Sequence, residues 1–276
     1  MSSTPEPPPS PSASPSPTAW QATGRPHKPL GVPGALVVLV VWLALSSLGF
    51  LPGRFGPLAQ APVPQALAAG FLLLCLLAFR WPHTAMRLPK PGTAGIMWFP
   101  WLYLPCFAAL IVWIGLPPVS QLIGLFALMA WIAISEELMF RGLLFPALRQ
   151  RLRIWPAMLL TSAVFGLIHL GNGLENGNFL AAAMQSLAAM MTGLLLVAMR
   201  VRRGSIWPAV SYHLLWNLGS FSLDLALRQH GTAGEPGVFS LVLLPLIVVL
   251  PNGLYALWLL RHAGREDLPG DVPGAA

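Results

Sequence analysis

Long apolar runs dominate this chain from residue 34 onward. Eight such segments follow one another, at residues 34–51, 64–80, 96–115, 120–149, 156–171, 178–200, 205–227 and 238–261. A transmembrane helix needs roughly 17–25 residues, so the fifth segment is marginal by length and the others suffice. The pattern predicts an all-α fold, a polytopic membrane helix bundle with about eight transmembrane helices.

The composition agrees with a chain that packs in lipid. Hydrophobic residues make up 55% of the 276 positions and charged residues only 9%, whereas a soluble domain carries roughly 25% charged residues. Residues 1–33 are rich in Pro, Ser, Ala and Thr and are predicted to form a disordered cytoplasmic tail. We expect one transmembrane domain at 34–265 and a short C-terminal tail at 266–276. The first apolar run is long enough to span, so we expect no cleavable signal peptide.

The basic residues predict the orientation of the bundle. The net charge is +7, but the positive side chains sit in short clusters between apolar segments, which argues against a nucleic-acid partner and for topology signals. The connections predicted to lie outside hold only Arg54 and Arg228. The connections predicted to lie inside hold Arg25, Lys28, Arg80, Arg87, Lys90, Arg149, Arg151, Arg153, Arg200, Arg202, Arg203, Arg261 and Arg265. Both termini are therefore expected in the cytoplasm of a multi-pass cell-membrane protein, and the composition favours a bacterial inner or plasma membrane.

Three charged residues interrupt the fourth apolar segment. Glu136 and Glu137 are adjacent, and Arg141 follows one helical turn later. Charges at bilayer depth cost a few kcal/mol or more and therefore indicate a functional site. Adjacent helical residues point about 100° apart, so the two carboxylates cannot share one direction. Glu137 and Arg141 are spaced i and i+4, which favours an ion pair. We therefore expect Glu137 to neutralise Arg141 and Glu136 to face a cavity.

Further polar residues in other apolar segments are predicted to lie at a similar depth. Measured from the cytoplasmic ends of their helices, Glu136, His169, His213 and Asn217 lie about 20, 20, 12 and 18 Å along the axis. A carboxylate and an imidazole facing one cavity can activate a water as the nucleophile that attacks a carbonyl. A second imidazole and an amide can donate to the oxyanion. These four residues are therefore the candidate catalytic group, with Glu137 and Arg141 in support.

These residues fall in three short motifs, Glu-Glu-x-x-x-Arg at 136–141, Phe-x-x-x-His at 165–169 and His-x-x-x-Asn at 213–217. Together they resemble the CPBP family of intramembrane proteases, the type II CAAX prenyl endopeptidases and their bacterial relatives, over about residues 120–222. The resemblance implies a glutamate-dependent intramembrane endopeptidase. It implies that the first glutamate and first histidine position water, and that the second histidine and the asparagine stabilise the oxyanion.

Alternative functions remain to be compared with this one. Glu136, His169 and His213 could hold a zinc ion with an open position, but no His-Glu-x-x-His signature is present and asparagine is a poor zinc ligand, so we expect no cofactor. A non-catalytic membrane protein with a transporter, immunity or scaffold role is the alternative from another class, because intramembrane Glu and His also build proton relays. The expected partners are the lipid bilayer and a membrane-associated peptide or protein substrate.

Overall fold

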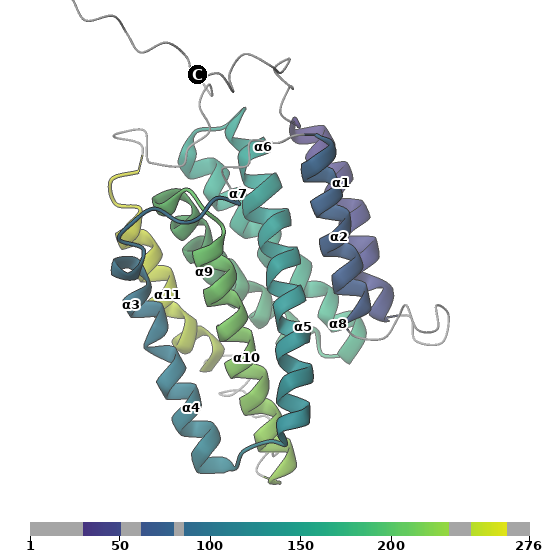
Figure 1. Cartoon of the computed structure of the whole chain (residues 1–276), viewed down its shortest axis with the longest axis vertical. Coiled ribbons are helices and arrows are strands. Elements are labelled where there is room, and N and C mark those ends of the chain that lie inside the picture. The colour runs from purple at the N-terminus through teal and green to yellow at the C-terminus, as the bar shows by residue number, and fades with distance from the viewer. Residues whose placement is uncertain (1–29, 51–61, 80–85, 232–243, 264–276) are drawn as a thin grey trace, which may run out of the picture.

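The computed structural model describes residues 30–50, 62–79, 86–231 and 244–263. Every regular element in these ranges is a helix, which confirms the all-α class. Figure 1 shows the longer helices running along the long axis of the molecule. The α-helices are α1 (Val32–Ser46), α2 (Val63–Ala78), α3 (Ala94–Trp101), α4 (Tyr103–Ile114), α5 (Val119–Glu137), α6 (Phe145–Arg149), α7 (Ile154–Ile168), α8 (Asn172–Asn176), α9 (Phe179–Arg203), α10 (Trp207–Gln229) and α11 (Leu244–Leu259).

Several of these helices are long and apolar enough to cross a membrane. Four continuous helical stretches meet both conditions, at Ala94–Ile114, Val119–Arg149, Ile154–Leu174 and Phe179–Arg203, and α1, α2 and α11 are shorter apolar helices. By length and composition, these helices fit a multi-pass membrane bundle. Helix α10 has 23 residues but a lower mean hydropathy, because it carries polar residues that include His213 and Asn217.

The predicted domain limits meet the described residues only in part. Residues 1–29 of the expected N-terminal tail and all of the 266–276 tail lie outside the described residues. The first helix begins at Val32 with Pro33 in its first turn, where the missing N–H of proline is tolerated. Helix α1 therefore starts two residues before the predicted boundary.

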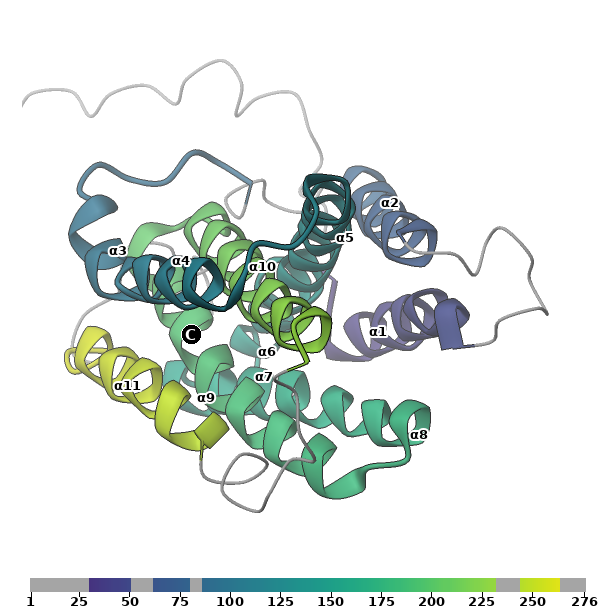
Figure 2. The same ribbon diagram turned by 90° about the horizontal axis from the view of Figure 1, so that it is seen from below.

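Helices α9 and α10 occupy the middle of the bundle. Helix α9 packs against α7 and α11, and α10 packs against α5, α4 and α9. Helices α1 and α2 pack against each other and lie at one side, where α2 contacts α5. Figure 2 shows this arrangement along the bundle, with α10 between α4, α5 and α9. Each segment with a predicted site residue thus reaches the interior.

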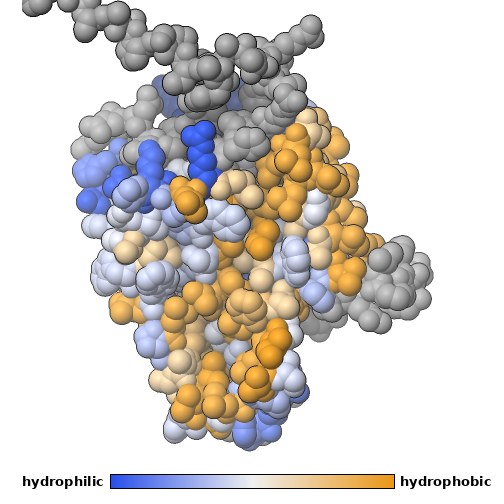
Figure 3. All heavy atoms as spheres, viewed as in Figure 1, coloured by the Kyte–Doolittle hydropathy of each residue, from blue (hydrophilic) through white to orange (hydrophobic). Residues whose placement is uncertain are grey.

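The surface separates by polarity along the long axis. Figure 3 shows hydrophobic residues over the α1–α2 side and the lower part of the molecule, and hydrophilic residues gathered near the upper end. Two hydrogen bonds join the loops at this end: Lys90 N donates to Arg203 O, and the Ser205 hydroxyl donates to Arg87 O. The basic loop before α3 is therefore held against the turn between α9 and α10.

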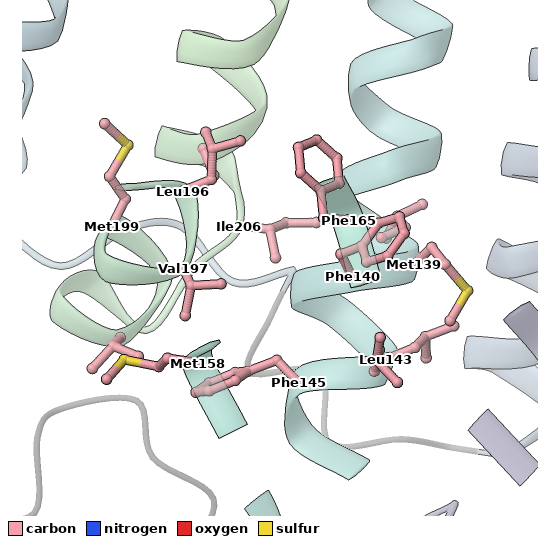
Figure 4. Packing of buried hydrophobic residues seen from close by; sticks show 14 of the residues in the cluster. Met139, Phe140, Leu143, Phe145, Met158, Phe165, Leu196, Val197, Met199 and Ile206 are labelled. Atoms are coloured by element: carbon pink, nitrogen blue, oxygen red, sulfur yellow. The ribbon is translucent and has the colours of Figure 1, made fainter. Parts of the chain in front are cut away.

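A tightly packed apolar layer supports the polar interior. The rings of Phe140 and Phe165 meet edge to face with centroids 5.0 Å apart, and Figure 4 shows both rings beside Ile206 and near Leu196. Helices α7 and α9 come unusually close here, because a Cβ added at Gly166 would lie 2.6 Å from the backbone oxygen of Ser186. Only glycine allows this approach, which brings the end of α7 and the middle of α9 together.

Candidate active site

The helix that carries the first motif changes its winding at the motif itself. Glu136 and Glu137 end α5, and Arg141 lies in a π-helix, η5 (Leu138–Leu144), that leads into α6. π-Helical turns occur frequently at functional sites. The apolar pattern predicts one uninterrupted segment at 120–149 and does not reveal this turn. Pro146 is the signal that could have found it, since a helical proline clashes with the carbonyl four residues earlier and an inserted residue relieves the clash.

Arg141 is completely buried and is held by two elements. Its Nη1 donates to Glu137 Oε1 at 2.9 Å, with both side chains fully buried. Its Nη2 donates to Gly193 O on α9, also at 2.9 Å, and its guanidinium carbon lies 4.3 Å from the centroid of the Phe165 ring. The expected ion pair between Glu137 and Arg141 is therefore present, and it also fixes α5 to α9.

Gly193 makes the contact of the arginine with α9 possible. A Cβ at this position would lie 3.3 Å from Arg141 Nη2 and 3.0 Å from Phe165 Cδ1. The main-chain carbonyl of α9 is thus open to the guanidinium only because no side chain intervenes. The site depends on this small residue as much as on the charged ones.

His213 lies between the two glutamates. Its Nδ1 is 2.9 Å from Glu137 Oε1, and its Nε2 is 3.7 Å from Glu136 Oε2. Sequence analysis had paired Glu137 with Arg141 alone, but the structure shows that Glu137 Oε1 also meets His213. The Glu136 side chain is 14% exposed, and its Oε2 has no hydrogen-bond partner among the described residues. A continuous row of polar side chains thus runs from Arg141 through Glu137 and His213 to Glu136.

His169 is oriented by the end of its own helix. Its Nδ1 lies 2.9 Å from the carbonyl oxygen of Phe165, one turn earlier. A carbonyl oxygen only accepts, so this contact assigns the proton to Nδ1. The other ring nitrogen, Nε2, is left to interact with groups in the neighbouring cavity.

A cavity of about 110 Å³ brings three of the four predicted catalytic residues together, without Glu136, which was expected to face it. His169, His213 and Asn217 all line it, although they come from different segments. Glu136 is not among its lining residues. Its Oε2 lies 3.7 Å from Nε2 of His213, which does line the cavity. The complete lining is Phe165, His169, Gln185, Ala188, Ala189, Thr192, Leu196, His213, Trp216, Asn217 and Val249.

The α9 wall of this cavity was not predicted. Gln185, Ala188, Ala189, Thr192 and Leu196 recur at helical spacing and line one side. The available signal was that Gln185 and Thr192, two polar residues in this mostly apolar segment, are seven positions apart and so share one helix face. Within the described ranges, no three His, Cys, Asp or Glu side chains are placed to share one metal ion.

These features define an all-helical bundle with long apolar helices and a buried polar site between them. Residues 118–219 match the family model described as Rce1-like, type II CAAX prenyl endopeptidase Rce1-like, so this segment is similar to a family of peptidases. The matched segment contains all three motifs and agrees closely with the predicted extent of the resemblance. No curated protein and no solved structure matches the chain.

Proposed function

We propose that this protein is an intramembrane endopeptidase in which Glu136 and His169 activate a water molecule. The observation that carries the proposal is the shared cavity: it collects His169, His213 and Asn217, and Glu136 touches its wall at His213. The peptidase family of residues 118–219 supports the same reaction. Among the described residues, no serine or cysteine lines the cavity, and the nucleophile we propose is water.

In the proposed reaction, Glu136 accepts a proton from water as general base. His169 Nε2 accepts the second hydrogen of that water and so directs its oxygen toward the peptide carbonyl. A carbon–oxygen bond forms and the carbonyl oxygen becomes an oxyanion. The peptide carbon–nitrogen bond then breaks, and Glu136 returns its proton to the leaving nitrogen. Water is consumed, and one carboxyl and one amino terminus are produced.

The oxyanion is stabilised by donors that the bundle holds in place. Asn217 contributes an amide and His213 contributes an N–H from the same face of α10. When both ring nitrogens of His213 carry protons, the imidazolium lies between the carboxylates of Glu136 and Glu137. The positive charges of this imidazolium and of Arg141 then balance the two negative charges. Donors fixed before the reaction stabilise developing charge without reorganisation. The ion-paired Glu137 and Arg141 support this arrangement by holding α5, α9 and His213 together.

The proposed membrane topology has eight spans with both termini in the cytoplasm. The positions of the described basic residues support this topology. All except Arg141 and Arg228 lie in or beside four connections: the loop before α3, the turn between α6 and α7, the turn between α9 and α10, and the segment after α11. In Figure 1 these turns all lie at the upper end. An excess of Lys and Arg marks cytoplasmic loops. The cleaved substrate is proposed to be a membrane-associated peptide or protein.

Substitutions at the two water-activating residues test the function. Membranes from cells with the wild-type protein and with Glu136→Gln are compared by proteomics to find cleaved termini, and cleavage is then repeated with purified protein. Glu136→Gln and His169→Ala are each expected to abolish cleavage while folded yield stays normal. Gln121→Leu, at an exposed residue of α5 that does not line the cavity, should retain turnover. Wild-type levels of cleavage by Glu136→Gln would reject the enzyme and favour a non-catalytic role.

A further inference from the structure

The cavity has a polar residue at its mouth that the proposed reaction does not use. Gln185 lines the cavity and is exposed, whereas Thr192, two turns further along the same face of α9, is only 8% exposed. The cavity therefore runs along α9 from a mouth at Gln185 to a buried region at Thr192. Between them lie Ala188 and Ala189, whose small side chains leave room beside the helix backbone.

A second side chain fixes the amide of Gln185. Asn172 Nδ2 donates to Gln185 Oε1 at 2.8 Å, so the carbonyl oxygen of Gln185 is engaged and its Nε2 keeps its two hydrogens for another acceptor. Asn172 follows directly after the short helix of His169–Gly171. The end of α7 that presents His169 therefore also sets the orientation of the amide at the mouth.

The surroundings of this amide point to the kind of molecule that enters. Leu170, Leu187 and Met190 are exposed apolar residues near Gln185 in the sequence of α7–α9, and a polar group among lipid-facing residues requires a function. Seven residues of α9 span about 10.5 Å, which equals about three residues of an extended peptide at roughly 3.3 Å each. The carbonyl groups of an extended peptide are acceptors that match the free donors of Gln185.

We propose that Gln185 is a substrate-positioning residue, which donates a hydrogen bond from Nε2 to a main-chain carbonyl of a peptide entering from the bilayer. This inference rests on the proposed endopeptidase function. The small α9 wall then admits the peptide main chain beside Ala188 and Ala189, and brings the scissile carbonyl toward His213 and Asn217. Because this hydrogen bond is made to the main chain of the peptide, it aligns the peptide whatever its sequence. Any preference for particular substrate side chains then comes from the other residues of the cavity.

The test measures cleavage of short synthetic apolar peptides by full-length protein in nanodiscs. Gln185→Leu removes the donor, and Gln185→Glu keeps the oxygen that accepts from Asn172 but replaces the donor with an acceptor. Loss of one neutral hydrogen bond is expected to raise KM roughly three- to tenfold for Gln185→Leu, with kcat little changed, as for loss of uniform binding. Gln185→Glu should raise KM further, and Asn172→Ala, which releases the amide, should raise it less.

A matched control is available at another pair of amides. Gln229 Nε2 donates to Gln121 Oε1 at 2.6 Å, also at the surface, so Gln121→Leu makes the same chemical change away from the cavity and should leave KM unchanged. If the wild-type protein cleaves the peptides but Gln185→Leu leaves KM unchanged, Gln185 does not position the substrate. The same conclusion follows if Gln121→Leu raises KM as much as Gln185→Leu does. In both cases the endopeptidase function still stands. A wild-type protein that cleaves none of the peptides and no membrane protein overturns both proposals.

Discussion

Glu137 Oε1 lies 2.9 Å from both Arg141 Nη1 and His213 Nδ1. One carboxylate oxygen therefore binds the arginine on its own helix and the imidazole on α10. This shared contact means that Glu137 does more than neutralise a buried cation. It also determines the position of His213, whose other nitrogen faces Glu136.

The first prediction concerns the folded yield of Glu137 and Arg141 variants. Glu137→Gln or Arg141→Met alone leaves a buried charge without its partner, at a cost of about 3–5 kcal/mol. Each single change should lower the folded yield in size-exclusion chromatography and the midpoint of thermal unfolding. The double change should recover much of the yield, because neither charge remains. It should still cleave poorly, because His213 has lost the carboxylate that orients it.

The comparison with Glu136 provides the control for this prediction. Glu136→Gln makes the same chemical change one residue away, and it should keep normal yield while abolishing turnover. If Glu136→Gln unfolds the protein and Glu137→Gln is stable but inactive, the roles assigned to the two glutamates are reversed.

The second prediction concerns the contact between α7 and α9. Gly166→Ala would place a methyl group 2.6 Å from Ser186 O and 2.9 Å from Met190 Cβ, so the helices must separate. Overpacking of this kind costs about 1–3 kcal/mol, and the thermal midpoint should fall. Cleavage should fall as well, because the cavity lies between these helices.

The control for the helix contact is Gly124→Ala on α5, where an added Cβ meets no atom within 4 Å. This change should leave the thermal midpoint unchanged or raise it, since alanine favours a helix by up to about 1 kcal/mol over glycine. Equal effects of the two substitutions would show that helix propensity, rather than the contact, determines the response.

The sequence could predict those features that depend on spacing along one helix or on depth. The i and i+4 spacing predicted the Glu137–Arg141 pair, and similar depth along their helices placed His169, His213 and Asn217 together. It could not predict contacts that depend on how helices rotate against each other. The Glu137–His213 bond, the reach of Arg141 to Gly193 and the α9 wall are all of this kind. The π-helix adds a rotation within one segment, so an ideal helical wheel mispositions the residues after it.

The third prediction concerns metal dependence. If Glu136 and His169 activate the water, cleavage needs no Lewis acid, and a chelator should leave the rate unchanged. The assay compares purified protein before and after incubation with chelator, followed by dialysis. Activity that is lost to the chelator and restored by added zinc would establish a metal-dependent protease instead.

The fourth prediction concerns topology. Reporter fusions near Gly56 and near Thr232, both outside the described residues, should report an external location, and a fusion after Arg265 should report the cytoplasm. The reason is the placement of basic residues, which the positive-inside rule assigns to cytoplasmic loops. A fusion after Arg265 that reports an external location would reject the eight-span topology, whereas the proposed chemistry would still be testable.

The fifth prediction concerns a proline in α3 and its compensation from α11. Pro100 lies inside α3 and has no N–H for the carbonyl of Ile96, four residues earlier. Tyr255 on α11 donates its hydroxyl to Ile96 O at 3.2 Å. Tyr255→Phe should therefore lower stability by about 0.5–1.5 kcal/mol, measured as a lower thermal midpoint. In a Pro100→Ala background the helix supplies its own N–H to Ile96 O, so the same Tyr255→Phe change should cost clearly less. Equal losses in the two backgrounds would mean that Tyr255 stabilises the bundle through packing with Phe99 and Trp258 rather than through this hydrogen bond.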